Sequence, residues 1–125
     1  MASAAPAGTR SVSQRAEIDT RLGLQYCLGD RNFYQKVLIN FSNSTDGKRL
    51  EELYQQENWQ EYAVTIHALK STSLTIGAVR LSDDAKALEY AARDNWIDFI
   101  REHHQTFLQK FDDTCTSIRL GDVKV

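Results

Sequence analysis

The stretch WQEYAVTIHALKSTSLTI at residues 59–76 carries a buried-type side chain at every third or fourth position. The positions that share this spacing are Tyr62, Ile66, Leu69, Ser73 and Ile76. Steps that alternate between four and three residues bring side chains onto one side of an α-helix. Antiparallel helical bundles bury a seam of this kind. The stretch therefore predicts a bundle helix, and Gly77 is a natural end for it.

The same period recurs on both sides of this helix. It predicts a helix that Asp30 caps and that runs to about residue 41, further helices over 79–93 and 97–118, and short ones over 18–28 and around 50–58. Asn58 and Asn95 are each followed three residues later by an acid, which predicts an N-cap at both positions. The expected fold is all-α, an antiparallel four-helix bundle with one or two short N-terminal helices.

The composition supports a single helical domain. The chain has 125 residues, of which 42% are hydrophobic and 26% charged, and its formal net charge is −2. One Pro and six Gly are too few for the tight turns of a sandwich, a barrel or a nucleotide-binding α/β fold. Residues 1–15, rich in Ala, Ser and Gly, are expected to be a flexible lead or linker remnant, and residues 16–122 to form the domain.

Charge, hydropathy and cysteine spacing exclude several kinds of partner. The near balance of acids and bases argues against nucleic acid. No apolar run reaches the ~20 residues that cross a bilayer, and the N-terminus lacks the apolar region of a signal peptide. We therefore expect a cytoplasmic protein without membrane contact. Cys27 and Cys115 show neither CxxC nor zinc-ligand spacing, so we expect buried thiols and no metal site.

His67 is the candidate functional residue. At ~100° per residue it points roughly 140° away from the centre of the apolar seam, so we expect it to face water. The positions predicted to surround it on one surface strip are Gln60, Ala63, Val64, Ser71, Leu74 and Ala78. Because these side chains are small, apolar or uncharged, the strip predicts a docking surface for a partner.

The chemistry of this strip suits a phosphoryl group. A histidine side chain is largely neutral at pH 7, so one ring nitrogen has a lone pair that can attack phosphorus. Lys70, three residues along the helix, can screen the roughly two negative charges that the group brings. The plain alternatives are that His67 is an ordinary surface residue and Lys70 an ordinary solvated charge.

The other histidines are weaker candidates. His104 falls in the apolar row of the last predicted helix, so we expect a side chain at the edge of the core with a partner for its nitrogen. His103 is expected to face solvent. Adjacent residues of a helix point ~100° apart, so the pair cannot hold one metal ion.

Two segments resemble a known family. HALKSTSLTIGA at residues 67–78 resembles the histidine-containing phosphotransfer (HPt) domain of bacterial multistep phosphorelays, as found at the end of hybrid sensor kinases. The residues after it that share in the resemblance are Leu81, Ala85, Leu88, Glu89, Ala91 and Ala92. LQYCLGDRNFY at residues 24–34 resembles the opening of such domains more loosely. The resemblance covers about residues 18–120.

The resemblance implies a phosphohistidine at His67, electrostatic support from Lys70, and receiver-domain aspartates as partners. It also implies a phosphocarrier without a kinase activity or an ATP site, with no cofactor of its own and with magnesium held by the receiver. We expect the domain to be a monomer. In agreement, the sequence has no Gly-rich phosphate loop, no Walker lysine and no clustered carboxylates for magnesium.

One residue departs from the family pattern and keeps a second function open. The family most often has Gly after the lysine, whereas this chain has Ser71. The alternative is a helical docking module that binds a receiver or another signalling partner without being phosphorylated. A metal-binding or catalytic bundle ranks last, because paired Glu and Glu-x-x-His motifs are lacking.

Overall fold

The computed structural model describes residues 17–124, and every regular element in this range is an α-helix. The helices are α2 (Thr20–Tyr26), α3 (Arg31–Ser42), α4 (Asp46–Gln55), α5 (Trp59–Thr75), α6 (Val79–Arg93) and α7 (Ile97–Arg119). The all-α prediction is confirmed. The prediction of a flexible lead over residues 1–15 lies outside the described residues.

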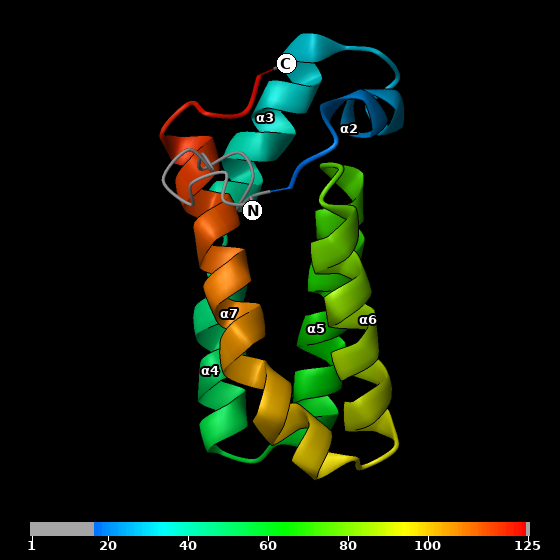
Figure 1. Cartoon of the computed structure of the whole chain (residues 1–125), viewed down its shortest axis with the longest axis vertical. Helices are drawn as coiled ribbons and strands as arrows, with labels where there is room; N and C mark the ends of the chain where they lie inside the picture. Colours follow the sequence, from blue (N-terminus) through cyan, green and yellow to red (C-terminus); the bar gives the residue numbers. More distant parts are fainter. Residues whose placement is uncertain (1–16, 125) are drawn as a thin grey trace, which may run out of the picture.

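The helices form an elongated bundle with a cap at one end. α5, α6 and α7 run along the long axis of the molecule, each antiparallel to the next (Figure 1). α3 and α4 together make the fourth side, with α3 packed on the upper part of α7 and α4 packed on α5 and the lower part of α7. α2 crosses the top, where it contacts α3 and α5.

The predicted seam of α5 forms the centre of the core. Its five members, from Tyr62 to Ile76, are fully buried. Burying one large aliphatic side chain contributes about 1.5–3 kcal/mol, so this seam holds α5 firmly among its neighbours. The two thiols, Cys27 and Cys115, are buried and free, as the sequence predicted.

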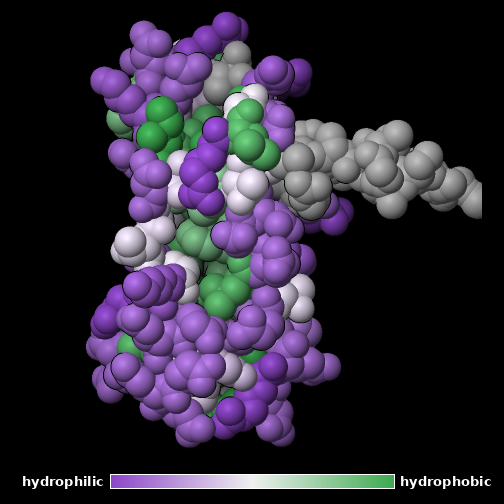
Figure 2. Space-filling model, turned by 90° about the vertical axis from the view of Figure 1, so that its left-hand side faces the viewer, coloured by the Kyte–Doolittle hydropathy of each residue, from purple (hydrophilic) through white to green (hydrophobic). Residues whose placement is uncertain are grey.

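The outer face that α4 and α7 share is mainly hydrophilic. Figure 2 shows this side of the molecule, with apolar atoms exposed in a hollow about halfway along it. Gly47 of α4 and Leu108 and Phe111 of α7 are among the residues that line a pocket between these two helices. None of the helices in the described range is long and apolar enough to cross a membrane.

The two predicted N-caps have different outcomes. Asn58 caps α5, because its side chain accepts a hydrogen bond from the Glu61 backbone N–H at 3.2 Å. The prediction for Asn95 is wrong: Trp96 occupies the N-cap of α7, and Asn95 has a φ of 61°. Trp96 N–H donates to the Ala91 carbonyl at 2.8 Å, which closes the C-terminus of α6. Asn95 therefore serves the end of one helix rather than the start of the next.

The cap at the top is tied to the end of α5. Asp19 N–H donates to the Gly77 carbonyl at 2.8 Å, and the Tyr34 hydroxyl donates to the Ile76 carbonyl at 2.7 Å. Gly77 has a φ of +91°, and a Cβ there would overlap the Asp19 carbonyl oxygen. Only glycine satisfies both the left-handed backbone and the close approach. The helix that carries His67 is thereby anchored at its C-terminal end.

Candidate functional site

The site is built where α5 and α6 pack closely together. Ala85 and Ala92 of α6 are buried, and small side chains let two helices approach each other. The Ser82 hydroxyl donates to the Lys70 carbonyl at 2.8 Å, which adds a polar tie between the two helices. This packing brings Glu89 of α6 beside His67 of α5.

Glu89 is a buried carboxylate with three partners. Its side chain is only 7% exposed. Oε2 lies 2.9 Å from Nδ1 of His67 and 3.0 Å from Nε of Arg93. Oε1 lies 2.9 Å from Nζ of Lys70. One buried acid thus joins the candidate phosphoacceptor to two cations.

These partners keep Glu89 ionised. Burial by itself would raise the pKa of this carboxyl group, but hydrogen bonds from Lys70, Arg93 and His67 outweigh it and lower the pKa below its ordinary value. A carboxylate is an acceptor only. His67 must therefore donate its Nδ1–H to Glu89.

This bond determines which nitrogen of His67 can react. With the proton held on Nδ1, the lone pair of the neutral ring lies on Nε2. The His67 side chain is 53% exposed, so it faces solvent as the sequence predicted. The imidazole is therefore fixed in orientation and tautomer on one side and open to a partner on the other.

The charges around His67 leave an excess of one positive charge. Lys70 and Arg93 contribute two cations, and Glu89 contributes one anion. The Lys70 side chain is 27% exposed and ion-paired, so it is more than an ordinary solvated charge. An excess positive charge favours the arrival of a dianionic phosphoryl group.

A family profile described as Hpt domain matches residues 42–119, more than half of the chain. The chain belongs to the Hpt domain family. The matched segment contains α5, α6 and α7 with His67, Lys70, Glu89 and Arg93. Domains of this family carry out histidine phosphotransfer in phosphorelays, where they interact with receiver domains. Neither curated proteins nor solved structures gave a significant match.

The surface strip around His67 in this Hpt domain is smaller than predicted. Gln60, Val64, Ser71 and Leu74 are exposed. Ala63 and Ala78, predicted to belong to the strip, are buried at 2% and 0% exposure.

The two errors have different physical causes. Ala63 lies on a part of α5 that the packed bundle covers, which the angle within a single helix does not reveal. Ala78 lies beyond the end of α5 and is the N-cap of α6, so the helical angle does not apply to it. The exposed strip of the Hpt domain therefore consists of Gln60, Val64, Ser71 and Leu74 around His67.

The structure places Glu89 and Arg93 in the candidate site, whereas the sequence analysis assigned a role to neither. Glu89 was only one of the residues on which the family resemblance rested. A signal for Glu89 was available: it lies four residues after Ala85 and three before Ala92, within the buried row of α6. A charged residue in a buried row requires a partner. The identity of that partner depends on the helix packed opposite, so sequence spacing could not supply it.

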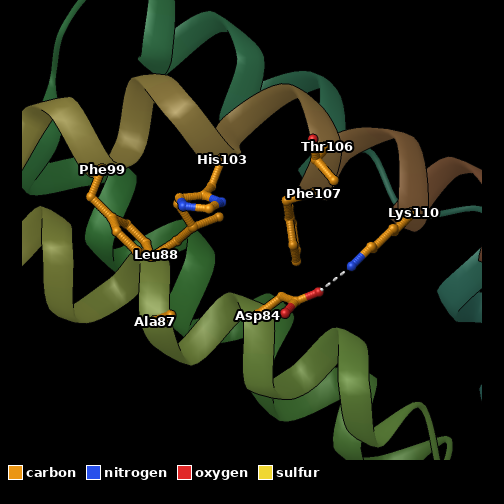
Figure 3. A pocket seen from close by; sticks show the side chains of 8 residues that line it. All are labelled: Asp84, Ala87, Leu88, Phe99, His103, Thr106, Phe107 and Lys110. Atoms are coloured by element: carbon orange, nitrogen blue, oxygen red, sulfur yellow. Dashed lines mark hydrogen bonds and ion pairs between the residues drawn. The ribbon is translucent and has the colours of Figure 1, made fainter.

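The remaining histidines of the Hpt domain lie away from this cluster. His103 is exposed and lines a hollow of about 160 Å³ between α6 and α7, which the Asp84–Lys110 ion pair of 3.0 Å spans (Figure 3). His104 is fully buried and both its ring nitrogens have partners, so the prediction of a bonded core histidine is confirmed. The described residues contain no group of three His, Cys, Asp or Glu side chains suited to a metal ion.

Proposed function

We propose that this Hpt domain carries a phosphoryl group on Nε2 of His67 between the aspartates of two receiver domains. The observation that carries the proposal is the 2.9 Å contact between Nδ1 of His67 and the buried Glu89 carboxylate. It leaves the second ring nitrogen as an exposed nucleophile, which is what an in-line transfer from another protein requires.

The phosphoryl group moves from the receiver to His67 in one in-line displacement. The Nε2 lone pair attacks the phosphorus of an aspartyl phosphate on the receiver. The Nε2–P bond forms while the P–O bond to the aspartate breaks, and the electron pair leaves with the aspartate as a carboxylate. The ring becomes positively charged while Nδ1 keeps its proton. Glu89 stabilises that positive charge through the hydrogen bond it already makes.

Lys70 and Arg93 support the phosphorylated state in this proposal. Both are bound to Glu89 in the unmodified domain and carry flexible, partly exposed side chains. A phosphoryl group on Nε2 adds roughly two negative charges next to them. The receiver supplies magnesium and the acidic pocket, and the Hpt domain supplies the nucleophile and its positioning. Residues 16–122 are the proposed functional unit.

A transfer assay tests the proposal directly. A receiver domain labelled on its aspartate is mixed with the Hpt domain in the presence of magnesium. The label should move to the Hpt domain in an acid-labile, base-stable form, and the isolated phosphohistidine should carry the group on Nε2. His67→Gln should accept no label. His103→Gln, which alters another exposed histidine, should accept label like the wild type.

A second donor separates chemistry from docking. Phosphoramidate phosphorylates histidine without a protein partner, so it should label the wild type and leave His67→Gln unlabelled. A wild-type domain that binds a receiver yet accepts label from neither donor would support the docking module instead. Label on His67→Gln would show that another residue is the phosphoacceptor.

A further inference from the structure

A second buried cluster lies at the opposite end of the bundle from the α2 cap. It is centred on His104 of α7, which is fully buried. Nδ1 of the ring is 2.9 Å from the Tyr62 hydroxyl on α5, and Nε2 is 2.7 Å from Oε1 of Glu51 on α4. The ring also stacks on Tyr54, with 3.8 Å between the ring centroids. One imidazole therefore joins α4, α5 and α7.

The partners determine the protonation state of this ring. Hydrogen bonds from Gln55 and His104 lower the pKa of Glu51, so Glu51 is a carboxylate and accepts the Nε2–H. Nδ1 of the neutral ring is then an acceptor, and the Tyr62 hydroxyl donates to it. Burial raises the pKa of Tyr62, which keeps that hydroxyl protonated. The neutral ring thus satisfies every polar atom of the cluster.

A proton added to Nδ1 would break this arrangement. Nδ1 would become a donor facing the hydrogen of the Tyr62 hydroxyl, which would have to turn away. Tyr62 is fully buried, and the described residues offer its hydroxyl no second hydrogen bond. A buried polar group without a partner disfavours the folded state.

We propose that His104 is an acid-sensitive lock: the neutral ring holds α4, α5 and α7 together, and protonation releases them. The titratable groups that face the ring are Glu51 and Tyr54 of α4 and Tyr62 of α5. Among the described interactions of the ring, none comes from an ionisable side chain of α6. Glu51 favours a charged ring, whereas burial opposes it. Burial is the larger effect, and it lowers the pKa of His104.

The direction of the pH effect follows from linkage. Because the folded protein holds His104 neutral, the unfolded chain takes up this proton first as the pH falls below about 6.5. The contribution of His104 to stability is complete above that pH and decreases below it, down to the lowered pKa of the folded state. The folding equilibrium constant should fall by up to about tenfold per pH unit in this window. The pKa values of Glu51 and Glu89 are lowered from 4.5, so these groups act only at lower pH.

Denaturant unfolding between pH 7 and pH 5 tests the lock on the whole chain. The folding constant of the wild type should decrease on acidification, and His104→Gln should reduce that decrease. Gln can donate to Glu51 and accept from Tyr62, but it does not titrate. His103→Gln is the matched control, because the neighbouring histidine is exposed, and it should keep the wild-type slope. Equal slopes in all three proteins would overturn the proposal.

NMR of the wild-type protein keeps the proposal testable if His104→Gln does not fold. At neutral pH, the ring nitrogens of His104 should report a neutral ring with its proton on Nε2. The ring should titrate below the pH at which a free histidine titrates. Tyr62→Phe removes the hydroxyl that occupies Nδ1, so it should shift the titration of His104 to higher pH. A ring that titrates at or above the pH of a free histidine, or one protonated on Nδ1 alone, would contradict the lock.

Discussion

Nδ1 of His67 and Oε2 of Glu89 lie 2.9 Å apart, although 22 positions separate the two residues along the chain. The contact crosses from α5 to α6, and it makes the carboxylate a positioning group for the imidazole. Lys70 and Arg93 bind the same carboxylate, so a change at Glu89 affects the nucleophile and both cations together.

Replacing Glu89 should lower the rate of phosphotransfer without removing the phosphoacceptor. Glu89→Gln keeps an acceptor for the Nδ1–H but loses the charge that stabilises a positive ring. Glu89→Ala loses both. A hydrogen bond to a charged group contributes about 1.5–3 kcal/mol, so we expect Glu89→Ala to slow transfer by about tenfold or more. The transfer rate of Glu89→Gln should lie between the rates of Glu89→Ala and the wild type. Single-turnover transfer from a labelled receiver measures the rates of both variants. A wild-type rate for Glu89→Ala would refute the positioning role of Glu89.

Removing Lys70 should weaken the phosphorylated state more than the fold. The ammonium group is partly exposed, so its attraction for the phosphoryl group is about 1 kcal/mol, a several-fold effect on the equilibrium. Lys70→Ala should lower the phosphorylated fraction at equilibrium with a receiver, and added salt should shrink the difference from wild type. Lys86→Ala, which removes an exposed lysine of α6, is the control. Equal phosphorylated fractions for Lys70→Ala and Lys86→Ala at low salt would contradict the electrostatic role of Lys70.

The exposed strip and the buried flank of α5 should respond differently to a new charge. Leu74→Glu and Val64→Glu alter exposed positions and should weaken receiver binding while costing under about 0.5 kcal/mol of stability. Ala63→Glu places a charge at a buried position and should cost several kcal/mol. Titration with a receiver measures the loss of affinity, and denaturant unfolding measures the loss of stability. Unchanged affinity in Leu74→Glu and Val64→Glu would exclude this strip as the docking surface.

Gly77 should tolerate no side chain. Gly77→Ala combines an unfavourable left-handed backbone with an overlap against the Asp19 carbonyl, so we expect a loss above about 2 kcal/mol. Gly121 also has a positive φ, of 75°, but nothing lies within 4 Å of a Cβ there. Gly121→Ala should therefore cost only the backbone effect, about 1 kcal/mol. Equal losses of stability in the two variants would show that the contact with Asp19 contributes nothing.

The positions of helices and the side of α5 that carries His67 could be predicted because they are local properties. A period of three and four residues determines which side chains share one side of a helix. The same angular relation turns His67 away from Leu69 and the other members of the seam. The Asn58 cap is local too, since it depends on a side chain and a backbone group three residues apart.

Other features depend on which helix packs against which. Asn58 and Asn95 are each followed three residues later by an acid, yet only Asn58 caps a helix. Asn95 lies in the turn that ends α6, where its φ is 61°. Ala63 is buried by the packing of α5 among its neighbours, and no angle measured within α5 contains that information. A charged residue in the buried row of α6 indicated that Glu89 needs a partner, but not which one.

The sequence by itself determined the helical period, the exposed direction of His67 and the cation one turn away, because the geometry of a single helix relates residues three and four positions apart. The tertiary structure decided that Glu89 holds Nδ1 of His67 and that Tyr62 and Glu51 enclose His104. Those contacts depend on the register and separation of packed helices, which result from burying the whole core at once.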